Sequence, residues 1–180
     1  MAFFAFGQDV RLAGARTAMN SMPRSVMMGK LPADAIPVRI DDPLGRGDSE
    51  PSGGASKLGD IISGAFSIYS PKLQKALTDF GVKFDFKAVQ VFLPGKEEAI
   101  EGYAWARGAP SVEVPSLEFF EIDAAKTQGH ALFDASLNFA TVRVVTAALK
   151  QHLEAAGLEG VYFVPTKEYG GALAMVLTMG

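Results

Sequence analysis

The chain has 180 residues, of which 48% are hydrophobic and 21% are charged, and its formal net charge is −3. A chain of this length buries roughly 70% of the surface that its unfolded state exposes, so we expect one folded domain rather than a disordered chain. The acidic pI of about 5.4 argues against a constitutive nucleic-acid binder, and the absence of cysteine excludes disulfides, thiol catalysis and cysteine-based zinc sites.

The start of the chain is apolar but lacks the features of a secretion signal. No basic residue precedes the Phe-rich opening, and Gln8, Asp9 and Arg11 follow it at once. The longest apolar run elsewhere, at 172–177, is much shorter than the roughly 20 residues that span a bilayer. We therefore expect a cytoplasmic protein without a membrane partner.

Residues 1–56 are expected to form an N-terminal segment that precedes the core domain. Phe3, Phe4 and Phe6 favour a short first strand at its start. Residues 36–40 alternate between apolar and polar side chains after a proline, as in an edge strand. Residues 41–56 contain four glycines, two prolines and three serines, which is typical of a mobile surface loop.

From residue 57 onward, the pattern is that of a core domain spanning 57–180. Its first strand is expected at 66–69, and Ser70 and Pro71 are typical of a helix N-cap and of the first helical position. A second strand at 88–94 ends in proline. Between these strands, apolar residues recur at helical spacing up to a stop at Gly81, namely Leu73, Ala76, Leu77 and Phe80.

The end of the chain repeats this pattern. Strands are expected at 141–145 and 161–165, and the helix between them ends at Gly157. The helices match at an offset of 76 residues and the strands at an offset of 71. The sequence therefore predicts two strand–helix–strand repeats, near 60–94 and 139–167, whose helices pack against a shared sheet.

Four further segments are expected to be strands. They are residues 102–107, 117–123, 130–134 and 172–177, the last of which follows a Gly-Gly turn. The expected fold is a single α+β domain with a mostly antiparallel or mixed sheet and two or three short helices.

Motifs for catalysis and cofactor binding are missing from the sequence. His130 and His152 are its two histidines and belong to different expected elements, so we expect no metal site. The sequence contains neither a Gly-x-Ser-x-Gly nucleophile elbow nor a phosphate-binding P-loop. We therefore expect a protein that is not an enzyme and takes no cofactor. A small ligand-binding domain or enzyme, with a pocket assembled from scattered residues, is the alternative.

Charge is unevenly distributed along the chain. Residues 1–40 have a net charge of +3, whereas residues 96–123 contain seven acidic and two basic residues, a net charge of −5. A solvated face is the commoner explanation for such an acidic stretch. The functional explanation is a footprint for a basic partner, which would raise the association rate more than the affinity.

Two segments carry a resemblance to a known family. The first runs from Lys57-Leu58-Gly59-Asp60 through Ser70-Pro71-Lys72-Leu73 to Leu77, and the second ends in Gly157-Leu158-Glu159-Gly160-Val161-Tyr162-Phe163. They are similar to the DUF1629-type group, also called immunity protein family 11, of bacterial toxin–immunity loci. The resemblance covers 57–94 and 139–167, with looser similarity back to about Met28, and its motifs are structural rather than catalytic.

This resemblance implies a non-enzymatic immunity protein that binds and blocks a cognate antibacterial toxin, such as a secretion-system effector used in bacterial competition. Aromatic anchors within a polar rim are typical of such interfaces, and the acidic stretch suits a basic toxin. The candidate toxin-binding residues are Glu97, Glu98, Glu101, Tyr103, Trp105, Glu118, Glu121 and Asp123. A place in the core is the alternative for Trp105. A scaffolding protein that makes contacts through its N-terminal Phe and Met residues is a third reading.

Overall fold

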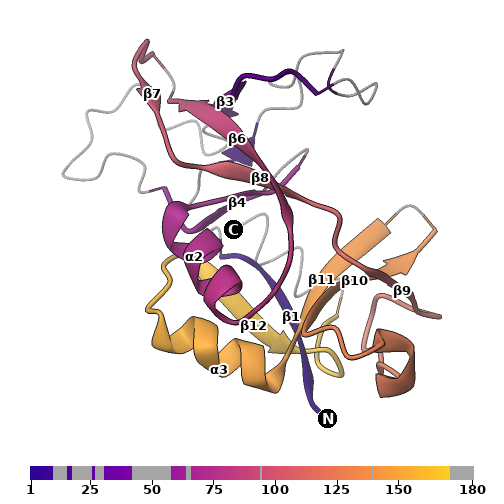
Figure 1. The fold of residues 1–180 in the computed structure, drawn as a ribbon. Helices are drawn as coiled ribbons and strands as arrows, with labels where there is room; N and C mark the ends of the chain where they lie inside the picture. Colours follow the sequence, from indigo (N-terminus) through magenta and orange to yellow (C-terminus); the bar gives the residue numbers. More distant parts are fainter. Residues whose placement is uncertain are drawn as a thin grey trace.

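The structure, a computed structural model, describes residues 1–9, 16–17, 26, 31–41, 58–63, 66–93, 95–138 and 140–170. These residues form an α+β domain with two mixed β-sheets and two α-helices, which lie next to each other on one side of the molecule (Figure 1). The α+β class predicted from the sequence is therefore confirmed, but the expected shared sheet is wrong. Each strand–helix–strand segment has a sheet of its own.

The first sheet has five strands, with β1 at its centre and the order β12-β1-β11-β10-β9. Its strands are β1 (Phe3–Gln8), β9 (Ser111–Glu113), β10 (Leu132–Leu137), β11 (Ala140–Thr146) and β12 (Val161–Pro165). β1 pairs antiparallel with both β11 and β12, whereas β9 and β10 are parallel. The start of the chain is therefore part of the core, rather than a segment that precedes it.

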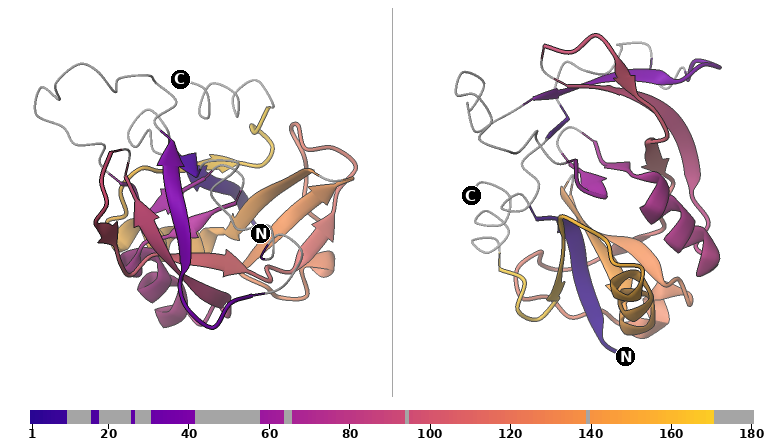
Figure 2. Two further views of the ribbon diagram at one scale, coloured as in Figure 1. Left: turned by 90° about the horizontal axis from the view of Figure 1, so that it is seen from above. Right: turned by 90° about the vertical axis from the view of Figure 1, so that its left-hand side faces the viewer.

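The second sheet has the order β2-β3-β6-β8-β5-β4, with β7 beside the far end of β6 (Figure 2). Its strands are β2 (Arg16–Thr17), β3 (Ile36–Asp41), β4 (Ile61–Ile62), β5 (Ile68–Tyr69), β6 (Asp85–Phe92), β7 (Ala99–Ile100) and β8 (Ala104–Arg107). β3 pairs in parallel with β6, and β2 covers only the last two residues of β3. Pro37 therefore lies on a stretch with one paired edge among the described strands, where a missing N–H is tolerated.

The helices α2 (Pro71–Asp79) and α3 (Ala147–Ala155) are nine residues long and begin 76 positions apart. Each begins with a hydroxyl N-cap, Ser70 or Thr146, whose side chain accepts from the third helical N–H. A glycine with positive φ, Gly81 or Gly157, follows each helix. The strands that follow, β6 and β12, begin 76 positions apart and end 73 positions apart, so their bounds do not fix the offset of 71 expected between these strands.

The two segments also share a strand arrangement. β5 and β6, which flank α2 in the chain, both pair antiparallel with β8, and β11 and β12 pair antiparallel with β1 in the same way. In both cases a strand from elsewhere in the chain lies between the two strands that the helix connects. This arrangement is the split β-α-β unit.

Three clusters of buried side chains hold the sheets and helices together, because strands at the centre present apolar residues to both faces. In β1, Phe6 faces the central cluster with the helices, whereas Phe3 and Ala5 face an outer cluster. Tyr69 and Ile68 on β5 divide in the same way between the central cluster and a second outer cluster. The central cluster contains Leu73 and Leu77 of α2 and Leu149 and Leu153 of α3.

Two of the expected strands differ from the structure or lie outside it. Residues 117–123 form bends rather than a strand, because Phe119 adopts a positive φ of 49° and Asp123 caps the short 3-10 helix Ala124–Thr127. The expected strand at 172–177 lies outside the described residues, as do the methionine-rich segment around 19–28, apart from Val26, and most of the 41–56 loop.

Candidate functional site

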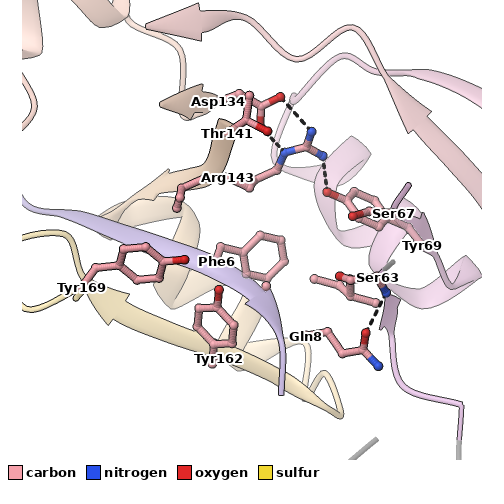
Figure 3. A pocket seen from close by; sticks show the side chains of 13 residues that line it. Phe6, Gln8, Ser63, Ser67, Tyr69, Asp134, Thr141, Arg143, Tyr162 and Tyr169 are labelled. Carbon is pink, nitrogen blue, oxygen red and sulfur yellow. Dashed lines mark hydrogen bonds and ion pairs between the residues drawn. The ribbon is translucent and has the colours of Figure 1, made fainter. Parts of the chain in front are cut away.

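A cavity of about 360 Å³ lies between the two sheets. Side chains reach it from β1, from the β4–β5 and β10–β11 hairpins and from β12 (Figure 3). Phe6 lies near the middle of the group in this view, and polar side chains surround it. The polar lining of the cavity comprises Gln8, Ser63, Ser67, Tyr69, Asp134, Thr141, Arg143, Tyr162 and Tyr169.

Arg143 forms the charged part of the cavity wall together with Asp134 and Tyr69. The Arg143 Nε donates to Asp134 Oδ1 at 2.7 Å and its Nη2 to Asp134 Oδ2 at 3.0 Å, a bidentate geometry, while Nη1 donates to the Tyr69 hydroxyl. Asp134 and Arg143 are opposite each other on β10 and β11. Burial lowers the pKa of Arg143, but Tyr69 and Asp134 together raise that pKa above its ordinary value. The guanidinium is therefore a fixed cation whose charge Asp134 balances.

Two tyrosines line another part of the cavity. Burial raises the pKa of Tyr162, and the neighbouring Tyr169 and Asp9 raise it further. Burial also raises the pKa of Tyr169, so both hydroxyls stay protonated near neutral pH. The Tyr162 ring lies across Gly7, where a Cβ would be 2.8 Å from its hydroxyl oxygen. Glycine at this position in β1 therefore allows the ring to pack on the strand backbone.

Gln8 connects the two sheets at the end of β1. Its side-chain Oε1 accepts from the backbone N–H of Ser63 at 2.7 Å, just after β4. Gln8 belongs to the first sheet and Ser63 directly follows β4 of the second, so this hydrogen bond fixes the separation of the two sheets on one side of the cavity.

Neither a metal cluster nor a histidine is found among the described residues that line the cavity. Among the described residues no three His, Asp or Glu side chains are placed to hold a metal ion. His152 lies between the helices, where its Nε2 is 3.0 Å from the Ala76 carbonyl and its ring is 5.3 Å from that of Phe80. His130 is exposed beside the 3-10 helix. Neither histidine lines the cavity, which therefore contains no imidazole base.

The candidate acidic residues fall into two separate groups. Glu97, Glu98 and Glu101 are exposed around β7, at the edge of the second sheet, and the Glu101 carboxylate accepts from Gln90 Nε2 at 2.9 Å. The other group flanks the first sheet, at the opposite end of the molecule (Figure 1). It consists of Glu118, Glu121 and Asp123.

Two carboxylates of the second acidic group, those of Glu121 and Asp123, have partners within the chain. Glu121 forms an exposed ion pair with Lys167 at 2.6 Å, which lowers the pKa of its carboxyl. Asp123 Oδ1 accepts from the Ala125 N–H as the cap of the 3-10 helix. The first group takes part in no ion pair between described residues and therefore keeps its negative charge unbalanced.

The two candidate aromatic anchors point into the second sheet's own cluster. Tyr103 is 8% exposed and its hydroxyl donates to the Gly59 carbonyl at 3.2 Å. Trp105 is partly buried against the same cluster, with its ring 5.7 Å from Phe66 and the Arg107 guanidinium 5.0 Å from its centroid. Tyr103 is therefore unavailable as an interface anchor, and Trp105 offers only part of its ring.

No model of a known protein family matches the chain, and no curated protein matches it.

Sequence reasoning missed the cavity because its lining comes from seven short stretches between Phe6 and Tyr169. The one local signal is Arg143, a charged residue within the apolar strand Val142–Val145. A cation at that place in a strand buried on both faces requires a partner, and its partner Asp134 lies on the neighbouring strand. Neither residue carries a motif.

Proposed function

We propose that this protein is a cytoplasmic immunity protein that binds a cognate antibacterial toxin and neutralises it without catalysis. The observation that carries the proposal is that both segments of the family resemblance belong to one kind of structural unit. Ser70, Leu73 and Leu77 cap and bury α2, and Thr146, Leu149 and Leu153 cap and bury α3. If the motifs of the resemblance are structural, their residues should cap helices and fill the core, and the residues named here do so.

The proposal includes the internal repeat. The equal helix lengths, the constant offset of 76 and the split strand arrangement support two copies of one unit. Their contact supports it as well, because His152 meets the Ala76 carbonyl and these two positions are themselves 76 apart. Equivalent residues meet at the axis of a twofold-symmetric pair.

The toxin-facing surface is the acidic group around β7. Glu97, Glu98 and Glu101 are exposed and form no ion pair among the described residues, whereas Glu121 of the other group is paired with Lys167. Unbalanced charge at an interface speeds encounter with an oppositely charged partner. The surface therefore favours a toxin with a basic face.

The test begins with capture of partners by the tagged protein from cells of its source organism, followed by association-rate measurements with the purified partner. In low salt we expect the triple variant Glu97→Gln, Glu98→Gln, Glu101→Gln to associate about tenfold more slowly than wild type, with little change in high salt.

The matched control removes three charges from the other acidic group, as Glu118→Gln, Glu121→Gln, Asp123→Asn. We expect this variant to associate at the wild-type rate. Equal slowing by both variants would place the effect in net charge and contradict the β7 surface, whereas a captured partner without toxic activity would contradict the function itself.

A further inference from the structure

We propose that the cavity between the two sheets is a binding site for a small uncharged ring that carries several hydroxyl groups, of the size of a monosaccharide. This site is separate from the acidic surface around β7 and does not depend on toxin binding. The proposal rests on the size of the cavity, its charge balance and its unpaired hydrogen-bonding groups.

The volume and position of the cavity suit a small ligand. About 360 Å³ lies at the lower end of the range typical of small-molecule sites, about 300–1,000 Å³. The walls come from both sheets and are fixed across the cavity by the Gln8–Ser63 hydrogen bond and by Arg143 reaching Tyr69. Thr141, an exposed residue of the lining, lies at its rim.

The charge balance excludes an ionic ligand. Arg143 and Asp134 are the two charged side chains of the described lining, and each neutralises the other through two hydrogen bonds. Both are mostly buried, with side chains 18% and 20% exposed. A charged ligand would lose hydration on entry without meeting a free counter-charge, which is costly. An uncharged molecule carries no such penalty.

Several polar groups of the lining have capacity left for a ligand. The Arg143 guanidinium has five N–H groups, and Asp134 and Tyr69 engage three of them. The hydroxyls of Ser67 and Thr141 have no hydrogen-bond partner among the described residues. Each of these hydroxyls donates and accepts, and so does each hydroxyl of a sugar, so the two sets complement each other.

Aromatic rings supply the apolar part of the lining. Phe6 lies at the middle of the group in Figure 3, and Tyr69 and Tyr162 also contribute to the wall. The Phe6 ring stacks on Phe163 with centroids 5.1 Å apart, which fixes its orientation. Phe6 and Tyr69 are only 3% and 1% exposed, so the partly buried Tyr162 ring is the one that offers a face to the apolar C–H side of a sugar ring.

The test is a titration of the full chain, followed by calorimetry and by ligand-detected NMR, with three neutral sugars: glucose, galactose and N-acetylglucosamine. Glucuronate and glucose 6-phosphate serve as charged counterparts, and adenosine serves as a flat neutral ligand. We expect at least one neutral sugar to bind with a dissociation constant in the millimolar range or below, and its charged counterpart to bind at least about tenfold more weakly.

Variants locate the binding. Ser67→Leu narrows the cavity and should abolish the signal of the sugar that binds. Tyr169→Phe removes one lining hydroxyl and should weaken binding about fivefold. Tyr103→Phe, the matched loss of a buried tyrosine hydroxyl outside the lining, should leave binding unchanged. Far-ultraviolet circular dichroism checks that each variant is folded.

Three outcomes would overturn the proposal. Tighter binding of a charged sugar or of adenosine would contradict the ligand class. Sugar binding unaffected by Ser67→Leu would contradict the location. The absence of a signal with all three neutral sugars would contradict the site as we describe it, while leaving toxin neutralisation untouched.

Discussion

Asp60 joins the two strand–helix–strand units through four hydrogen bonds, two of its carboxylate and two of its backbone. Its Oδ1 accepts from the Ser70 hydroxyl and its Oδ2 from the Glu159 N–H at 2.7 Å. Its backbone N–H donates to the Glu159 carbonyl at 2.9 Å, and its carbonyl accepts from the Ser70 N–H at 3.0 Å. The residue is 7% exposed, so little water replaces these contacts when they are lost.

We predict that Asp60→Asn lowers the free energy of unfolding by about 2 kcal/mol, within the range of about 1.5–3 kcal/mol for a hydrogen bond to a charged group. Asparagine keeps only one acceptor oxygen, so whichever way its amide is turned, one of the two side-chain hydrogen bonds is reversed or lost, and the charge that strengthens both is removed. Urea denaturation measures the change. Asp79→Asn, in an exposed pair with Lys75, is the control and should cost less than about 0.5 kcal/mol. Equal losses in both variants would contradict the role of Asp60.

Tyr103 gives a pH-dependent prediction. Burial and the nearby Asp60 raise the pKa of Tyr103 to about 12, whereas tyrosine in an unfolded chain has a pKa of about 10. The folded state therefore keeps this proton where the unfolded state loses it. The resulting stability is fully present below pH 10 and declines as the pH rises through 12.

Urea denaturation of wild type and Tyr103→Phe at pH 9 and at pH 11 checks this prediction. Both proteins lose stability from other titrating groups, but the wild type should lose more, because phenylalanine has no proton to release. An equal loss in the two proteins would show that the Tyr103 hydroxyl titrates alike in both states.

At the scale of elements, the helices could be predicted because their signals are local. Ser70-Pro71 before an apolar stripe and a glycine after it define α2, and the same logic places the end of α3 at Gly157. The expectation at 117–123 failed because alternation alone says nothing of Phe119, whose positive φ breaks an extended strand. The local sequence pattern therefore predicted both helices but not the bend at Phe119.

The two helix caps have unequal surroundings, and this yields a prediction. The Ser70 hydroxyl accepts from the Leu73 N–H and also donates to Asp60, whereas the Thr146 hydroxyl accepts only the longer 3.4 Å bond from Leu149. An N-cap substitution to alanine costs about 0.5–2 kcal/mol. Ser70→Ala should lie at the top of that range and Thr146→Ala at the bottom, as measured by chemical denaturation. The reverse order would contradict the stronger role that we assign to the Ser70 cap.

For the molecule as a whole, the order of the strands within each sheet could not be predicted from the sequence. β1 pairs with β12 although their residues are more than 150 positions apart, and β8 lies between β5 and β6 although it follows both in the chain. Pairings of this separation depend on the complete set of apolar faces rather than on any local pattern. The sequence therefore predicts a segment that precedes the core, whereas the start of the chain is the central strand of the first sheet.

The candidate toxin-binding residues also differ in how far the sequence alone could predict their surroundings. The exposed acidic residues around β7 could be predicted, because charge at loops and edges is usually solvated. The burial of Tyr103 could not, since its neighbours Ile36, Val89 and Val91 come from two other strands.

None of the described helices is long and apolar enough to cross a membrane.

Toxin neutralisation is tested most directly by the growth of cells that express the captured partner, alone and together with this protein. We predict that the partner alone arrests growth and that co-expression of the wild type restores it. The triple β7 variant should restore growth less completely when its expression is limiting. Growth that the partner does not impair, or arrest that this protein does not relieve, would contradict toxin neutralisation.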